Sequence, residues 1–120
     1  AEILVQAWRL SLAAHGWAVG RYVVMPDHVH FFAAPAESTA KTLSLFVRYW
    51  KRATGMEIRE RADPSFAWQR EFFDHLVRAG ESYRQKWEYV RCNPVRAGLV
   101  CEPEAWPYQG EICPLVWPGR

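Results

Sequence analysis

The strongest constraint on the fold is a pair of β-forming runs interrupted by one short break. Residues 17–24 (WAVGRYVV) and 28–33 (HVHFFA) are rich in β-branched and aromatic residues, and residues 25–27 (MPD) separate them. This pattern predicts two antiparallel strands joined by a tight turn. The chain is therefore limited to folds that contain an antiparallel sheet.

Segments with helical periodicity flank the predicted hairpin. Apolar residues recur at helical spacing through residues 3–14, and residues 15–16 (HG) predict the end of that helix. After the hairpin, residues 37–39 (EST) predict a helix cap, and an apolar stripe follows through residues 43–50. We expect this second helix to stop near Gly55.

The second half of the chain predicts one more strand and one more helix. Residues 66–77 mix aromatic and polar side chains, which is typical of a strand, and a helix follows after Gly80 and extends to residue 92. Residues 93–94 (NP) are expected to end it, because proline disfavours helical geometry in the residue before it. The tail from about residue 99 is rich in proline, so we expect it to be irregular.

This order of elements predicts an α+β fold, a ferredoxin-like antiparallel sheet packed by helices, in a single domain over residues 1–120. A ferredoxin-like layer needs one more strand in front of the first helix. The chain begins at Ala1 with that helix already under way. We therefore expect the first strand to be missing from this chain, either because residues upstream of Ala1 supply it or because the protein is degenerate.

Composition fits one compact, soluble domain. The chain has 120 residues, of which 50% are hydrophobic, enough for one core. No apolar run approaches the roughly 20 residues that span a bilayer, and no signal-like leader is present, so we expect a cytoplasmic protein. Twelve of the fifteen cationic residues are arginine, which suits phosphate, but with a net charge of +2 a mixed solvated surface is the commoner meaning.

The HVH sequence at residues 28–30 is the clearest sign of a functional site. Because side chains alternate along a strand, His28 and His30 project from one face and Val29 from the other. Two imidazoles spaced about 6 to 7 Å along a strand can share one divalent ion. The alternative is a pair of hydrogen-bonded structural histidines, which is what an isolated HxH more often means.

Tyr89 lies on the shoulder of the third helix, about 100° around the axis from Val90. Asn93 is four positions further on, so its carbonyl oxygen could join a metal shell at the same place. Tyr49 has a similar shoulder position, but Ala53 follows four residues later and offers no ligand. An amphipathic tyrosine without a functional role is the alternative interpretation of Tyr89.

Taken together and in order, the motifs resemble those of one family. They are MPDHVH at residues 25–30, WQR at 68–70, FDH at 73–75, Arg78, YVRCNPVRAGLV at 89–100 and WPY at 106–108. This set is similar to the REP-associated tyrosine transposases, within the superfamily of HUH single-tyrosine transposases. The similarity covers roughly residues 17–108, and the combination of HxH with the distant YxxxNPxxAGL string is specific. The family normally has a central strand beside the strand with the histidines, which this chain lacks.

The resemblance implies a metal-dependent DNA strand transferase. His28 and His30 would be the HUH histidines, Tyr89 the nucleophile, and Asn93 the third protein ligand to Mg²⁺ or Mn²⁺. The substrate would be single-stranded DNA with a hairpin, and the intermediate a 5′-phosphotyrosine with a free 3′-hydroxyl. The protein would act as a monomer or as a homodimer. The cations that we expect along the DNA are Arg48, Lys51, Arg52, Arg91 and Arg96.

Two other function classes stay open. One is a non-catalytic single-stranded nucleic-acid-binding module, which needs aromatic residues on the sheet face where His28 and His30 are predicted. The other is a domesticated, inactive transposase that acts as a DNA-binding regulator. Trp106 and Tyr108 could stack on bases, although packing of the tail is the commoner role of such residues. His75 could serve as a base for the tyrosine, but beside an aspartate a structural role is the commoner one.

Overall fold

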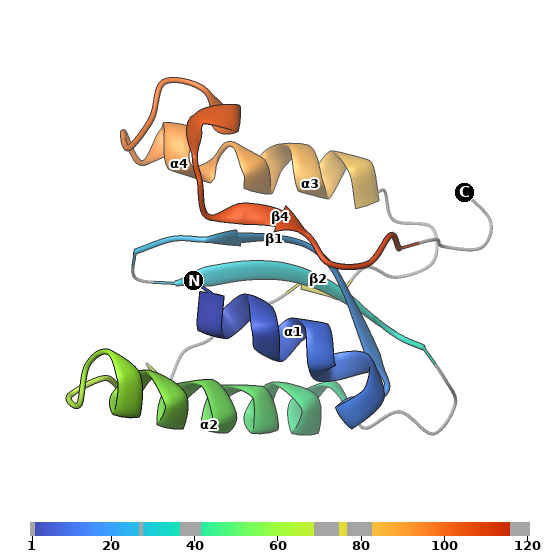
Figure 1. Cartoon of the computed structure of the whole chain (residues 1–120). Coiled ribbons are helices and arrows are strands. Elements are labelled where there is room, and N and C mark those ends of the chain that lie inside the picture. Colours follow the sequence, from blue (N-terminus) through green and yellow to red (C-terminus); the bar gives the residue numbers. More distant parts are fainter. Residues whose placement is uncertain (1, 27, 37–41, 69–74, 77–82, 116–120) are drawn as a thin grey trace.

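The computed structural model describes residues 2–26, 28–36, 42–68, 75–76 and 83–115. A four-stranded sheet lies between helices, with α1 and α2 on one face and α3 and α4 on the other (Figure 1). The elements in chain order are α1 (Glu2–His15), β1 (Trp17–Val24), β2 (Val29–Pro35), α2 (Leu43–Arg61), β3 (His75–Leu76), α3 (Tyr83–Arg91), α4 (Asn93–Arg96), the 3₁₀ helix η1 (Pro103–Ala105) and β4 (Gln109–Glu111). The α+β class is as predicted, and the architecture is compatible with a ferredoxin-like fold. No helix of these described ranges is long and apolar enough to cross a membrane.

The sheet is built around the predicted hairpin. Its strand order is β3-β2-β1-β4, with β1 antiparallel to both β2 and β4. The turn between β1 and β2 is closed by the Met25 N–H, which donates to the His28 carbonyl oxygen at 2.8 Å. β3 is parallel to β2 and pairs with it directly at Phe32 and Ala33, as the helical crossover through α2 allows. At these two residues β3 therefore lies directly beside β2, and the first element that the structure describes is the helix α1, as the sequence predicted.

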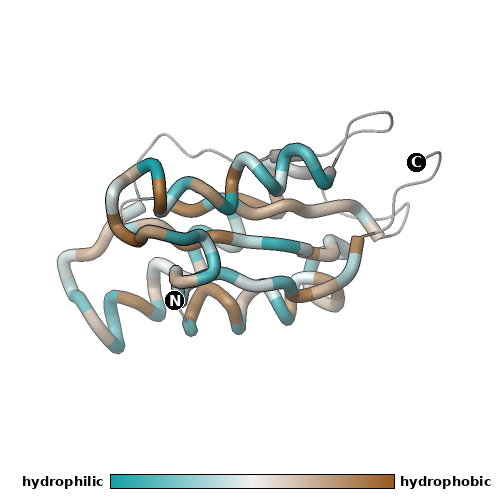
Figure 2. Tube along the Cα trace, turned by 90° about the horizontal axis from the view of Figure 1, so that it is seen from above, coloured by the Kyte–Doolittle hydropathy of each residue, from teal (hydrophilic) through white to brown (hydrophobic). Residues whose placement is uncertain are grey.

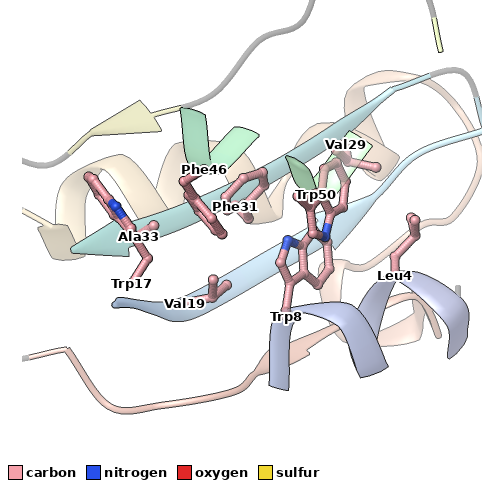
Figure 3. Close-up of a cluster of buried hydrophobic side chains, with 9 residues drawn as sticks. All are labelled: Leu4, Trp8, Trp17, Val19, Val29, Phe31, Ala33, Phe46 and Trp50. Carbon is pink, nitrogen blue, oxygen red and sulfur yellow. The ribbon is translucent and has the colours of Figure 1, made fainter. Parts of the chain in front are cut away.

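An aromatic core fills the space between the sheet and the pair α1 and α2. Its buried members are Leu4, Trp8, Trp17, Val19, Val29, Phe31, Ala33, Phe46 and Trp50 (Figure 3). Trp8 of α1 and Trp50 of α2 stack face to face, with ring centroids 5.2 Å apart and planes inclined by 6°. This contact joins the two helices to each other on their face of the sheet.

A smaller core lies under α3 on the opposite face, and it consists of Val23, Met25, Phe32, Trp87 and Val90. The ring of Phe32 meets that of Trp87 edge to face at 6.4 Å. In the view from above, hydrophilic and hydrophobic residues alternate around the helices, as expected for helices that pack one side against a sheet (Figure 2). The small core is what fixes the position of α3 relative to the hairpin.

The second helix is longer than its sequence predicted. α2 continues through Gly55 to Arg61, so the predicted stop near Gly55 was wrong. Gly55 is buried against Trp68, whose Cδ1 atom lies 3.4 Å from the place where a Cβ would be. Tertiary packing thus outweighs the helix-breaking tendency of glycine here. The N-cap is Thr42, whose hydroxyl accepts from the Leu45 N–H at 3.3 Å, and the predicted cap at residues 37–39 lies outside the described residues.

The third predicted strand is present only in part. Residues 66–68 are irregular, residues 69–74 and 77 lie outside the described residues, and only His75–Leu76 form a strand. Trp68 has a structural role, because its indole N–H donates to the buried hydroxyl of Thr54 at 3.0 Å. This bond holds the segment after α2 against the aromatic core.

The chain after α3 differs from the prediction in two ways. α3 ends at Arg91 as expected, but Pro94 lies in the first turn of a further short helix, α4, where a proline without an N–H is tolerated. The tail is not irregular throughout, since β4 adds a strand to the sheet by pairing with residues 21–23 of β1. The tail therefore crosses back to the hairpin.

Candidate metal and nucleophile site

The two histidines lie together at the turn end of the hairpin. His28 comes immediately before β2 and is exposed, whereas His30 lies within β2 and is 8% exposed. Their ring centroids are 4.9 Å apart and their planes are nearly perpendicular, at 83°. Val29 and Phe31 between and after them point into the aromatic core on the other face. The predicted alternation of this segment is confirmed.

Tyr89 and Asn93 face the same region from α3 and α4. A cavity of about 590 Å³ is lined by Met25, His28, His30, Tyr89, Val90, Asn93, Arg96 and Ala97. Val90 is 1% exposed and anchors α3 in the small core, while its neighbour Tyr89 is 67% exposed at the cavity. The junction of α3 and α4 then brings Asn93 to the cavity from the first position of the short helix. The four predicted site residues thus meet at one place, although about sixty residues of chain separate the two pairs.

Arg96 connects the tyrosine to the asparagine. Its guanidinium carbon lies 4.0 Å from the centroid of the Tyr89 ring. One of its terminal nitrogens donates to the Tyr89 carbonyl oxygen at 2.7 Å, and also to the side-chain oxygen of Asn93. In the sequence, the signal for this contact is the seven-residue spacing, which places Arg96 about two helical turns after Tyr89.

The donor atoms of the cavity suit a divalent metal. Two imidazoles and an amide oxygen fit Mn²⁺ at least as well as Mg²⁺, which prefers oxygen ligands. The Asn93 oxygen already accepts from a cationic group, the guanidinium of Arg96, so it is directed towards positive charge. Among the described residues no group of three or more His, Cys, Asp or Glu could hold a metal. Beside the two histidines, the amide oxygen of Asn93 is the further described side-chain donor at this cavity that could ligate a metal.

The other predicted DNA-binding cations do not line this cavity. Arg48, Lys51 and Arg52 belong to α2, which lies on the far face of the sheet (Figure 1). Arg91 is on α3, but it is paired with Glu88 at 2.9 Å and with Glu104 at 3.1 Å. The hydrogen bonds that Arg91 donates to these two carboxylates raise its pKa. Of the five predicted cations, only Arg96 adjoins the histidines and the tyrosine.

Met25 is a site residue that the sequence did not reveal. It lines the central cavity and two neighbours, one of about 400 Å³ that reaches Trp68 and one of about 370 Å³ beside Trp106 and Tyr108. Trp106 is anchored, because its indole N–H donates to the Val24 carbonyl oxygen at 3.0 Å, and Tyr108 is 49% exposed. The packing role expected for the tail thus holds for Trp106. In the sequence, the position of Met25 in the break between the two predicted strands was the feature that could have indicated its place beside the histidines.

The motifs between residues 68 and 78 are described only in part. His75 belongs to β3, and its backbone pairs with that of Phe32 in β2. Residues 69–70, 73–74 and Arg78 lie outside the described residues. Of the FDH motif, the structure thus describes only His75, whose backbone lies beside the strand that carries His30.

Comparison with known proteins finds relatives over most of the chain. A Haemophilus influenzae protein named "Putative REP-associated tyrosine transposase" is 26% identical over 114 residues, which cover 81% of this chain and 64% of the relative. An Escherichia coli protein named "REP-associated tyrosine transposase" is 27% identical over 108 residues, which cover 84% of this chain and 62% of the relative. The chain thus spans less than two thirds of the length of these curated relatives. No family model and no solved structure matches it.

Proposed function

We infer that the chain belongs to the REP-associated tyrosine transposases, and we propose that it cleaves single-stranded DNA and transfers the cleaved strand. Its motifs and the names of its curated relatives support the family. The observation that carries the activity is the shared cavity of His28, His30, Tyr89 and Asn93. The proposal treats Tyr89 as the nucleophile and the other three residues as ligands of Mn²⁺ or Mg²⁺.

The exposed side chain of Tyr89 would attack the phosphodiester directly. Its hydroxyl oxygen forms a bond to phosphorus, and the bond from phosphorus to the 3′ oxygen breaks. The phenol proton is lost to solvent and the leaving oxygen takes up a proton, so the products are a 5′-phosphotyrosine and a free 3′-hydroxyl. Attack by the 3′-hydroxyl of a second strand reverses the bond exchange and completes strand transfer.

A phenol is a weak nucleophile at neutral pH, so the phosphate must be activated. A bound divalent metal would supply this by withdrawing charge from the phosphate oxygens. The chain contributes orientation, because β2 fixes His30 and the buried Val90 fixes the adjacent Tyr89. Exposure of Tyr89 leaves room for a DNA strand at the cavity.

A covalent-trapping assay tests the proposal. The protein is incubated with an end-labelled single-stranded hairpin oligonucleotide and Mn²⁺, and the products are separated under denaturing conditions. We expect a labelled species at the combined mass of protein and DNA, and we expect Tyr89→Phe to abolish it. Tyr49→Phe is the matched control, because Tyr49 is also exposed, at 41%, but lies on α2. That variant should form the adduct normally.

Three outcomes would contradict the proposal. An adduct that persists in Tyr89→Phe would assign the nucleophile to another residue. Adduct formation in the presence of EDTA would exclude the metal. A protein that shifts the DNA in a native gel but never attaches to it would be a binding module or an inactive regulator.

A further inference from the structure

One charged group connects the nucleophile to a metal ligand of the proposed site. The guanidinium of Arg96 lies over the ring of Tyr89, with its central carbon 4.0 Å from the ring centroid. The same group donates to the side-chain oxygen of Asn93, which is the atom that would bind the metal. Arg96 therefore holds, in the free chain, the ligand atom on which metal binding depends.

The charge of Arg96 is available to an anion, in contrast to that of Arg91. Arg91 is held by two carboxylates, Glu88 at 2.9 Å and Glu104 at 3.1 Å. Arg96 forms no ion pair within the ranges that the structure describes, and its side chain is exposed. A DNA phosphate at the cavity would be the first strong anionic partner for this guanidinium.

We propose that Arg96 is a positioning residue that exchanges partners when DNA enters the cavity. In the free chain it holds the Asn93 oxygen and lies over one face of the Tyr89 ring. When a phosphate of single-stranded DNA arrives, the guanidinium turns to the phosphate, which releases the Asn93 oxygen to the metal. The inference rests on the proposed function and adds the order in which metal and DNA assemble at the site.

Electrostatics gives the reason for the exchange. A guanidinium bonded to the Asn93 oxygen would lie beside a divalent ion bound by the same oxygen, and the two positive charges repel each other. A phosphate placed between them attracts both. DNA should therefore raise the affinity for the metal, and by thermodynamic linkage the metal should raise the affinity for DNA by the same factor. Repulsion between one and two unit charges about 6 Å apart in water corresponds to roughly a tenfold change in a binding constant.

Mn²⁺ binding measured by electron paramagnetic resonance tests the exchange without any activity readout. The proteins carry Tyr89→Phe, which prevents cleavage and keeps the ring under Arg96. Arg96→Gln removes the charge but keeps a polar side chain, and Arg91→Gln is the matched control on the same side of the sheet. We expect Arg96→Gln to bind Mn²⁺ about tenfold more tightly than its parent without DNA. Addition of a short single-stranded oligonucleotide should strengthen Mn²⁺ binding in the parent and in Arg91→Gln, but much less in Arg96→Gln.

The outcomes separate this inference from the proposed function. Unchanged or weaker Mn²⁺ binding by Arg96→Gln would overturn the exchange, since Arg96 would then only cap α3 through the Tyr89 carbonyl oxygen. A chain that binds no Mn²⁺ in any variant would overturn the metal site and the exchange together. Thermal unfolding of each variant confirms that the proteins compared are folded.

Discussion

The two faces of the sheet are packed differently. On the α1 and α2 face, Trp8, Phe31, Phe46 and Trp50 are each 2% exposed or less, and the tryptophans stack at 5.2 Å. On the α3 face, burial rests on a few residues such as Val90, and the neighbouring Tyr89 is 67% exposed. Stability is therefore concentrated on one face, which leaves the other free to present polar groups around a cavity.

A single strand serves both faces. Val29 and Phe31 of β2 enter the aromatic core, whereas His30 and Phe32 point towards α3. Because the alternation of a strand is strict, the position of the histidines is fixed by the burial of their neighbours. Changes on the aromatic face should cost stability, and changes on the α3 face should cost binding and chemistry.

Truncation of Trp50 should give the largest effect. Trp50 contacts Trp8, Phe31 and Trp68, with ring centroids 5.2 to 5.5 Å away. Trp50→Ala should lower the free energy of unfolding by about 3 to 5 kcal/mol, because it leaves a cavity in the aromatic core. Urea unfolding followed by circular dichroism measures the loss. Met56→Ala is the control, since Met56 is on α2 but 49% exposed. A similar loss in both variants would contradict the claim that burial in the aromatic core is what stabilises this face.

Removal of an imidazole on the α3 face should mainly affect binding. His28 is exposed and precedes β2, so His28→Ala should change the free energy of unfolding by less than about 1 kcal/mol. Loss of a direct ligand should weaken Mn²⁺ binding by about a hundredfold, or roughly 2.7 kcal/mol. Mn²⁺ titration alongside urea unfolding measures both quantities. Equal Mn²⁺ affinities in the two proteins would assign the histidine pair a structural role.

The hairpin and the histidine pair could be predicted from sequence because both depend on local patterns. Alternation over residues 28–33 is set by neighbouring residues, and the turn is set by the break at residues 25–27. Trp87 and Val90, three residues apart on α3, are likewise both buried, as helical spacing predicts. The site residues thus came from periodicity, and the resemblance supplied their roles.

Other features could not be predicted because they depend on distant contacts. β4 is three residues with a central glycine, and only its pairing with β1 makes it a strand. α2 passes Gly55 because the helix continues to pack beyond it. Arg48 and Arg52 are four residues apart, which puts them on one side of a helix, but this spacing does not indicate that the helix lies across the sheet from the histidines.

The smallest effect should come from Arg91, which tests whether charges or the small core hold α3. Its ion pairs with Glu88 and Glu104 are on the surface, where such pairs contribute little, so Arg91→Gln should shift the urea midpoint far less than Trp50→Ala does.

A backbone hydrogen bond, and then the hydrogen bond from Arg91, lower the pKa of Glu104 below its ordinary value. A carboxylate whose pKa is lower in the folded state stabilises that state above its unfolded pKa, and this contribution disappears as the pH falls through the folded pKa. The difference between wild type and Arg91→Gln should therefore be present at pH 7 and vanish in acid. A difference that grows in acid would show that Arg91 holds α3 by something other than these two carboxylates.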